Sequence, residues 1–200
     1  MINKFKIPKD IYNDLIKCVD DRSIENNKNL AGNIREEYSL QNYLNKFEPF
    51  FLNECIKSNF LSNYFKKLNI LWPNSQNLIL SHLWSNIQKK YEFNPVHEHS
   101  GIFSFILFIK IPYLAEEQFK KAPGYKSMSN KAGTLSFFDL DSNSPGGIRE
   151  TNLKVDKKWE GTGLIFKSDL KHCVYPFYTE GDRITISGNI SINNRRINDA

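Results

Sequence analysis

The sequence predicts a mainly β protein in which an N-terminal layer of helices packs on a C-terminal jelly-roll. Residues 1–72 contain segments with apolar side chains at helical spacing, whereas residues 73–200 form a series of short segments rich in β-branched and aromatic residues. Gly, Pro, Asn or Asp separates these short segments, which is typical of a β-sandwich or barrel. A chain of 200 residues with 40% hydrophobic residues can bury one sizeable core, so 1–200 is expected to be a single domain.

The first helix is expected within IPKDIYNDLIKCVDDR. Ile11, Leu15 and Val19 recur every four residues, which places them on one face of a helix. Asp10, shortly after Pro8, is a candidate N-cap. This helix should cover one face of the β-layer.

A loop and a second helix should follow. The segment NNKNLAGNIREEY is expected to be a loop because Gly32 and several Asn interrupt it. The second helix is expected from Pro49. Its apolar residues lie close to helical spacing and are Phe51, Cys55, Phe60, Tyr64 and Leu68.

Eight segments after Pro73 are expected to be strands. They are NLILSHLW (77–84), KKYEFNPVH (89–97), IFSFILFIKI (102–111), GTLSFFDL (133–140), GIRETNLKV (147–155), GTGLIFK (161–167), HCVYPFY (172–178) and RITISGNISI (183–192). Two longer loops, 115–132 and 141–147, interrupt the series. The first has the length of loops that often act as lids.

Composition argues against several classes of protein. Charged or polar residues interrupt every apolar run well before the roughly 20 residues of a membrane span. The N-terminus MINKFKIPKDIYNDL lacks the apolar core of a signal peptide, so a cytoplasmic protein is expected. The net charge is +5, but the lysines are scattered and do not predict a nucleic-acid-binding stripe. Three cysteines without paired spacing argue against a disulfide framework or a thiolate zinc site.

The stretch NPVHEHSGIFSFILFIKIPY (94–113) places two histidines directly before an apolar run. Residues two apart in a strand point to the same face, so His97 and His99 would face one way and Glu98 the other. Two imidazoles on one side of a β-scaffold can bind a first-row transition metal. Taken alone, the same pair could be two surface histidines near a strand end.

A third histidine and a basic residue follow in the last strands. His172 could supply a third metal ligand, and Arg183 would share a strand face with Thr185 and Ser187. A guanidinium can hold a carboxylate through two parallel hydrogen bonds, and a neighbouring hydroxyl can add a third. A metal site beside such a carboxylate anchor suits a 2-oxo acid that chelates iron.

These motifs resemble those of the iron(II)/2-oxoglutarate-dependent oxygenases, most closely a small branch found in phages and marine bacteria. The matching pieces are LAGNIREEY (30–38), YEFNPVHEHSGIFSFILFIKIPY (91–113) and EGTGLIFKSDLKHCVYPFYTEGDRITISGNI (160–190). The N-terminal helices match weakly. The resemblance implies a double-stranded β-helix with iron at one mouth, and a location in the host cytoplasm if a phage encodes the protein.

By position, the resemblance implies that His97 and His172 are metal ligands and that Arg183 binds the far carboxylate of 2-oxoglutarate. The expected function is therefore an iron(II)- and 2-oxoglutarate-dependent dioxygenase, an oxidoreductase. It would couple decarboxylation of 2-oxoglutarate to oxidation of a substrate by O2, as in a hydroxylase. The substrate is not indicated. No membrane or nucleic-acid partner is expected, and a homodimer stays open.

The chain departs from the wider superfamily at His99, where Asp or Glu would be usual. Three arrangements are open. Both histidines of the motif could bind iron together with His172 as three neutral imidazoles, which the two-residue spacing favours. A kink could instead turn Glu98 inward and leave His99 outside the ligand set. In the third arrangement, Asp139 or Asp141 supplies a carboxylate.

Further residues near the motifs are candidates to touch the co-substrate, the substrate or the metal ligands. They are His82, Trp84, Asn86, Tyr91 and Asn189. Each also has a plainer interpretation, because Trp and Tyr in strands usually pack and a strand histidine usually makes a local hydrogen bond.

Two other classes compete with the oxygenase interpretation. A cupin-like or cysteine-dioxygenase-type metal enzyme also suits three histidines but needs no 2-oxoglutarate. A non-catalytic β-sandwich could bind nucleic acid or a virion partner through its basic surface, and would show strong salt dependence without a tight metal. The fold alone cannot decide among these classes.

Overall fold

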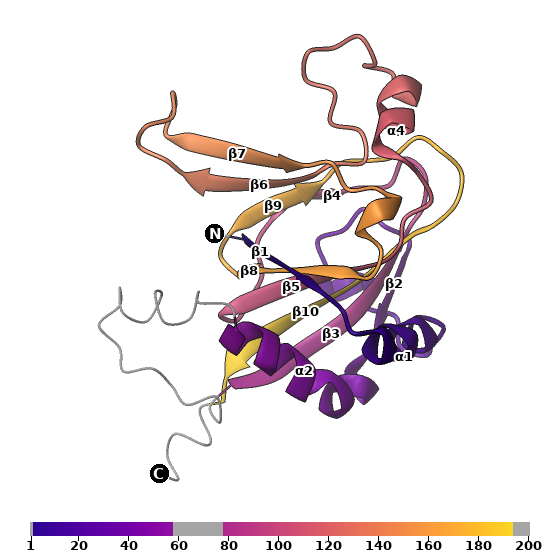
Figure 1. The fold of residues 1–200 in the computed structure, drawn as a ribbon, viewed down its shortest axis with the longest axis vertical. Coiled ribbons are helices and arrows are strands. Elements are labelled where there is room, and N and C mark those ends of the chain that lie inside the picture. Colours follow the sequence, from indigo (N-terminus) through magenta and orange to yellow (C-terminus); the bar gives the residue numbers. More distant parts are fainter. Residues whose placement is uncertain (1, 58–77, 194–200) are drawn as a thin grey trace.

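The computed structural model describes residues 2–57 and 78–193, and it confirms the predicted fold class. Two antiparallel sheets face each other in a double-stranded β-helix, and two helices lie on the outer side of the larger sheet (Figure 1). The larger sheet has the strand order β1-β8-β5-β10-β3-β2, and the smaller sheet has the order β4-β9-β6-β7.

All eight segments predicted as strands contain strands. In the larger sheet the strands are β1 (Ile2–Lys6), β2 (Glu36–Ser39), β3 (Leu78–Gln88), β5 (Phe103–Lys110), β8 (Thr162–Lys167) and β10 (Arg183–Ile192). In the smaller sheet they are β4 (Asn94–His97), β6 (Leu135–Leu140), β7 (Ile148–Leu153) and β9 (Lys171–Val174). Only the end of segment 89–97 is a strand, because Tyr91 adopts a positive φ of 71° in a turn.

The N-terminal part of the chain contributes strands as well as helices, which differs from the predicted helical layer. β1 pairs with β8 along one edge of the larger sheet, and β2 pairs with β3 along the other. β2 lies in the segment that was expected to be a loop. Both strands are short and carry charged residues, as edge strands often do, so neither shows a long apolar run in the sequence.

The two helices occur where apolar spacing predicted them, with different starts. Helix α1 (Lys9–Val19) has Pro8 at its N-cap position, and Asp10 lies inside the first turn instead of capping it. Helix α2 (Leu44–Lys57) begins before Pro49, directly after the 3₁₀ turn η2 (Gln41–Tyr43). Pro49 therefore lies within the helix, where it removes one hydrogen-bond donor without ending it.

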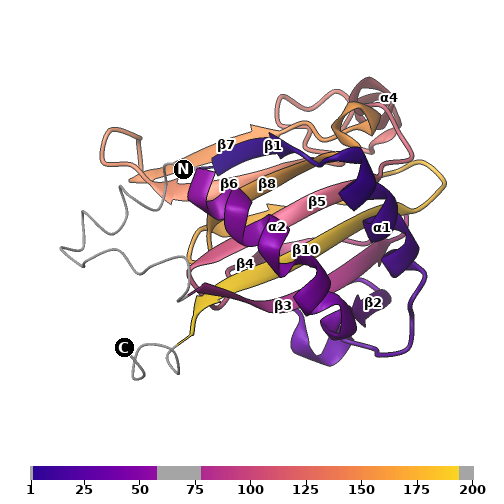
Figure 2. The same ribbon diagram turned by 60° about the horizontal axis from the view of Figure 1, so that its bottom comes forward.

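The helices cover the outer face of the larger sheet (Figure 2). Phe51 and Cys55 of α2 are buried, as predicted, and the ring of Phe51 stacks on Phe105 of β5 at 3.9 Å between centroids. Phe60, Tyr64 and Leu68 lie outside the described residues. Because side chains alternate along a strand, every second residue of β3, β5 and β10 packs against the helices, and the others face the smaller sheet.

A second apolar cluster fills one end of the space between the sheets. Its largest members come from both sheets, from the β5–α4 connection and from the β9–β10 connection, and are Phe108, Tyr113, Phe137, Phe166 and Phe177. The other end of the same space is polar and hollow. The described chain also contains η1 (Asn27–Asn29), α4 (Ala115–Lys121) and η4 (Lys157–Trp159). None of the described helices combines the length and the apolar character that crossing a membrane requires.

Candidate functional site

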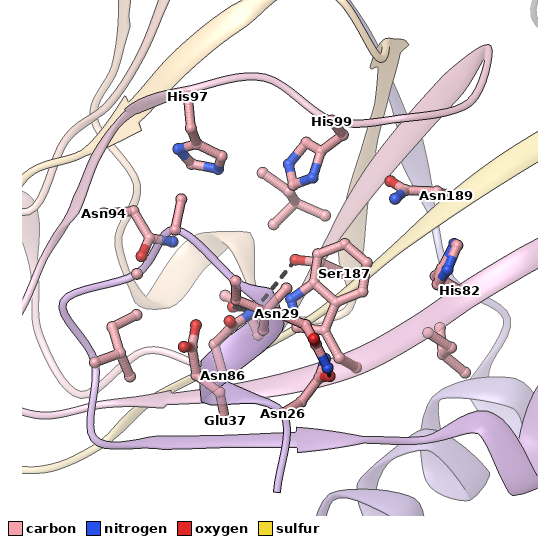
Figure 3. Close-up of a pocket in the computed structure, with 18 of the residues that line it drawn as sticks. Asn26, Asn29, Glu37, His82, Asn86, Asn94, His97, His99, Ser187 and Asn189 are labelled. Atoms are coloured by element: carbon pink, nitrogen blue, oxygen red, sulfur yellow. Dashed lines mark hydrogen bonds between the residues drawn. The ribbon is translucent and has the colours of Figure 1, made fainter.

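A cavity of about 710 Å³ opens between the sheets at their polar end, which is within the usual size of small-molecule sites. One wall is formed by inward-facing residues of β3 and β10. Trp84 pairs across these strands with Ser187, and Asn86 pairs with Thr185. The opposite wall carries histidines from the smaller sheet (Figure 3).

The structure brings His97, His99 and His172 together at this wall. His97 ends β4 and pairs in register with His172 on β9, while His99 lies just beyond β4. One ring nitrogen from each histidine lies within 4.8 Å of the others, and the Nε2 atoms of His99 and His172 are 3.2 Å apart. The two-residue spacing thus places both histidines of the motif on the same side.

Backbone carbonyl groups fix the orientation of two of these rings. Nδ1 of His97 lies 2.7 Å from the Pro95 carbonyl oxygen, and Nδ1 of His172 lies 3.0 Å from that of Leu170. A carbonyl oxygen can only accept, so each ring donates its Nδ1–H and carries its lone pair on Nε2, where that of His172 can accept from Nε2 of His99. Such outer hydrogen bonds are typical of histidines that ligate a metal.

Burial keeps the three imidazoles neutral. It lowers the pKa of His97, and it lowers the pKa of His99 to about 4, with a further contribution from the charge of His97. The pKa of His172 falls to about 3, again mainly through burial and then through its two histidine neighbours. Three neutral nitrogen donors at one point fit iron(II) by donor type, because imidazole suits this ion and the lone pairs need no deprotonation.

Two of the three possible carboxylate donors lie outside the cavity, and the third, Glu98, lines it with its carboxylate paired to a lysine. The Glu98 side chain is exposed and pairs with Lys171 at 2.8 Å. Asp139 lies opposite Arg149 in the β6–β7 pair and lines a different cavity. Asp141 stabilises the turn after β6, where its Oδ1 accepts from the Asn143 amide at 3.0 Å. The geometry therefore favours the three-imidazole arrangement, while the ligand assignment itself stays a prediction.

Arg183 lies in the same cavity and is only 2% exposed. Its Nη1 donates to the Tyr113 hydroxyl and to the Gly133 carbonyl oxygen, both at 3.3 Å. No carboxylate within residues 2–57 and 78–193 forms an ion pair with it. A buried guanidinium without an anion is costly, so this position is suited to an anionic ligand.

The neighbours of Arg183 on β10 also face the cavity. Asn86 Nδ2 donates to the hydroxyls of Thr185 at 3.3 Å and Ser187 at 3.4 Å, which holds the three side chains in one row. Asn189 is already occupied, because its Oδ1 accepts from the Ser104 hydroxyl at 2.9 Å. These contacts leave Thr185 and Ser187 placed to donate to a ligand beside the guanidinium.

The remaining candidates fall into two groups. Trp84 is buried in the cavity wall with its ring 5.5 Å from that of His99. His82 lines the outer part of the cavity but is exposed, and its Nδ1 lies 3.2 Å from the Ser81 hydroxyl. Tyr91 is 60% exposed in the turn before β4, packs edge-on against Tyr178, and does not line the cavity. The expectation that Tyr91 might touch a ligand has no support in this geometry.

Sequence reasoning missed two residues that line the cavity, Asn94 and Glu37, and one that contacts Arg183, Tyr113. Asn94 and Tyr113 are the two ends of the stretch that carries the histidine motif, and only the folded structure shows these contacts. Glu37 lies in EEY, which was taken as loop, so its alternation with β2 neighbours was not considered. The loop 115–132, considered as a lid, contains α4 and does not line the cavity.

Sequence comparison finds one family. The profile of a family described as "Putative 2OG-Fe(II) oxygenase" matches residues 82–189, which is more than half of the chain. The matched segment begins on β3 and ends on β10, so it contains the three histidines and Arg183 but not β2. No curated protein matches the chain by sequence.

Several solved structures are similar in fold at low sequence identity. A prolyl-4-hydroxylase from Pseudomonas putida is 13% identical with a TM-score of 0.52, over 96% of this chain and 92% of that chain. The viral collagen prolyl hydroxylase of Paramecium Bursaria Chlorella virus-1, in complex with 2OG, is 13% identical with a TM-score of 0.52, over 94% of each chain. HygX from Streptomyces hygroscopicus, with nickel, 2-oxoglutarate and hygromycin B bound, is 10% identical with a TM-score of 0.54, over 96% and 83%.

Proposed function

The chain belongs to the 2OG-Fe(II) oxygenase family and is therefore an oxidoreductase, and from this premise we propose that it is a hydroxylase that uses 2-oxoglutarate, iron(II) and O2. Decarboxylation of 2-oxoglutarate would be coupled to oxidation of a second molecule in the same cavity. The family match argues against the competing interpretation as a non-catalytic binding protein.

In this proposal His97, His99 and His172 hold the iron. Bound iron would supply two functions, chelation of the 2-oxo acid and activation of O2. The three rings bring no negative charge, so the full double charge of the cation remains for an anionic co-substrate. The backbone carbonyls at Pro95 and Leu170 keep two of the Nε2 atoms directed at the metal position.

Arg183 would bind the far carboxylate of 2-oxoglutarate, and its position is the observation that carries the proposal. The guanidinium is buried in the histidine-lined cavity and lacks an anionic partner in the described part of the chain. A cupin-like enzyme that does not use 2-oxoglutarate would leave this charge unexplained. Thr185 and Ser187 can each add a hydroxyl donor to the same carboxylate.

The Tyr113 hydroxyl holds the guanidinium in place from behind. It accepts from Arg183 and donates to the Gly133 carbonyl oxygen at 3.2 Å, so the two side chains and this carbonyl form a closed triangle. Gly133 has a φ of +68°, and a Cβ there would lie 2.9 Å from the tyrosine oxygen. A larger residue would therefore push Tyr113 out of this triangle.

Anaerobic titration tests the proposal directly. The protein is mixed with iron(II), and 2-oxoglutarate is added while the weak visible charge-transfer band of the chelate is followed. The band should appear with one equivalent of each component, and exposure to O2 should then yield succinate. A protein that binds iron but shows neither a band nor succinate would refute the use of 2-oxoglutarate and support the cupin-like alternative.

A further inference from the structure

One wall of the cavity is built by residues outside the segment that matches the family. Residues 26–39 run from the edge of the larger sheet to the smaller sheet. The Asn26 amide donates to the Glu37 carbonyl oxygen at 2.8 Å, and the Asn33 amide donates to that of Phe93 at 2.9 Å. This segment therefore closes the side of the cavity between β2 and β4, beside the histidines.

Glu37 is a buried acidic residue of this wall with an unused hydrogen-bond acceptor. It pairs in register with Asn86, so its side chain faces the cavity together with the Asn86–Thr185 row. It is 1% exposed, and its Oε2 is buried and accepts no hydrogen bond from any described residue. Burial, and then the charge of Glu92, raise the pKa of Glu37 to about 7. A buried carboxylate without a partner costs free energy when it ionises, and a bound cation would offset that cost.

A second unused acceptor lies next to Glu37. Oδ1 of Asn94 is buried and also lacks a hydrogen-bond partner among the described residues. Gly32 packs against both side chains, because a Cβ at this position would lie 2.5 Å from Asn94 Oδ1 and 2.7 Å from Glu37 Oε1. Figure 3 shows Asn94 and Glu37 facing the same part of the cavity, on the side of His97.

We propose that Glu37 and Asn94 form the recognition site for a positively charged nitrogen, an amine or a guanidinium, on the primary substrate. A carboxylate and an amide oxygen both accept, so their ligand must donate, and a charged nitrogen donates the strongest hydrogen bonds. The carboxylate of 2-oxoglutarate cannot serve here because it would repel Glu37. Arg183, on the row beyond Asn86, takes that anion instead.

The inference deepens the proposed function by naming the substrate class, but the binding step can be measured without turnover. Zinc(II) replaces iron, 2-oxoglutarate is present in excess, and butylguanidinium is titrated by calorimetry. Butylurea is the matched neutral probe, because it has nearly the same shape without the charge. Butylguanidinium should bind at least tenfold more tightly than butylurea. Equal binding of the two probes to the unmodified protein, or binding of neither, would overturn the inference.

Two variants locate the effect. Glu37→Gln keeps the size of the side chain and should reduce the preference for butylguanidinium to less than threefold. Glu36→Gln is the matched control, because Glu36 is the preceding residue of β2 and forms ion pairs with Arg22 at 2.8 Å and Lys89 at 3.0 Å. This control should keep the preference. If both variants lose the preference for butylguanidinium, or if neither does, Glu37 is not the residue that recognises the cation.

The outcomes separate this inference from the oxygenase proposal. The protein could prefer the cation through Glu37 and yet form no iron–2-oxoglutarate chelate. That result would support the recognition site and refute the use of 2-oxoglutarate. A chelate band without any preference for the cation would support the use of 2-oxoglutarate and refute the recognition site. A titration with the peptide acetyl-Gly-Gly-Arg-Gly-Gly-amide distinguishes the source, because tighter binding of the peptide than of butylguanidinium would assign the nitrogen to a protein side chain.

Discussion

Replacing Arg183 with methionine tests the anion site at its centre. Methionine fills much of the same space but removes the charge from a position that is 2% exposed. Loss of one member of a buried charge pair costs about 2–5 kcal/mol. At 1.4 kcal/mol for each tenfold change, this corresponds to an apparent affinity for 2-oxoglutarate that is about 30-fold to 4000-fold weaker.

The affinity of Arg183→Lys for 2-oxoglutarate should lie between those of the unmodified protein and Arg183→Met. Lysine keeps the charge but loses the fork that can contact both oxygens of a carboxylate. Loss of one hydrogen bond to a charged group costs about 1.5–3 kcal/mol, so the affinity should fall about 10-fold to 100-fold. Both existing hydrogen bonds of Arg183 are 3.3 Å long, so they orient the guanidinium but are weaker than the charge-assisted bonds that a carboxylate would add.

The assay is succinate formation against 2-oxoglutarate concentration for the three proteins, with iron binding measured separately without co-substrate. Iron affinity should change little, because the proposed iron ligands are the three histidines and Arg183 is not a ligand. Arg149→Met is the control, since Arg149 lies on β7 beside Asp141 and lines a different cavity. An Arg183→Met protein with unchanged dependence on 2-oxoglutarate would refute the anion site.

Three further predictions follow from the same geometry. His172→Ala should lose iron in equilibrium dialysis while its circular dichroism spectrum stays native, because the ring is held at a preformed site; retained stoichiometric iron would contradict this. Glu98→Gln should keep both iron and turnover because its carboxylate points to Lys171, whereas His99→Ala should lose both; the opposite pattern would indicate a carboxylate ligand. Glu37 has a pKa raised from 4.5 to about 7, mainly by burial and then by Glu92, so its contribution to stability is complete below pH 4.5 and is lost as the pH rises through 7. Between pH 5 and pH 8, denaturant unfolding should show a loss of about 2.5 kcal/mol in the unmodified protein without ligands and a smaller loss in Glu37→Gln; equal losses in the two proteins would exclude Glu37 as the cause.

The β-strands of the core were predictable because each carries a local signal. Segments such as IFSFILFIKI and RITISGNISI combine β-branched and aromatic residues with turn residues on both sides. Arg183 and Thr185 line the same cavity, as alternation along a strand predicts, and His97 and His99 also share a side although His99 lies just beyond β4. Local patterns of this kind need no knowledge of which strands are neighbours.

The edge strands and the second half of the cavity could not be predicted in this way. β2 has only the four residues EEYS, and its pairing with β3 is decided by contacts far along the chain. Glu37 looks like an ordinary surface acid until that pairing turns it inward. The early start of α2 was missed because Pro49 is a common first residue of helices, whereas here the turn η2 has already begun the helix. The position of β2 and the inward side of Glu37 are therefore determined by strand pairing and not by local propensity.

The closure of the cavity by residues 26–39 has a consequence for how such a protein can change. Pairing of β2 with β3 joins this segment to the larger sheet, and the Asn33 amide joins it to the Phe93 carbonyl oxygen just before β4; such main-chain bonds do not depend on side-chain identity. Cavity-facing side chains of the segment could therefore change while the barrel stays closed, provided that the close packing at Gly32 is kept. In the proposed recognition site, Glu37 belongs to this segment and Asn94 lies three residues before His97, so only the Glu37 half could change without altering the stretch that carries the histidines. If Glu37 recognises the substrate as proposed, exchange of this short segment would alter the choice of substrate and leave the three histidines and Arg183 in place.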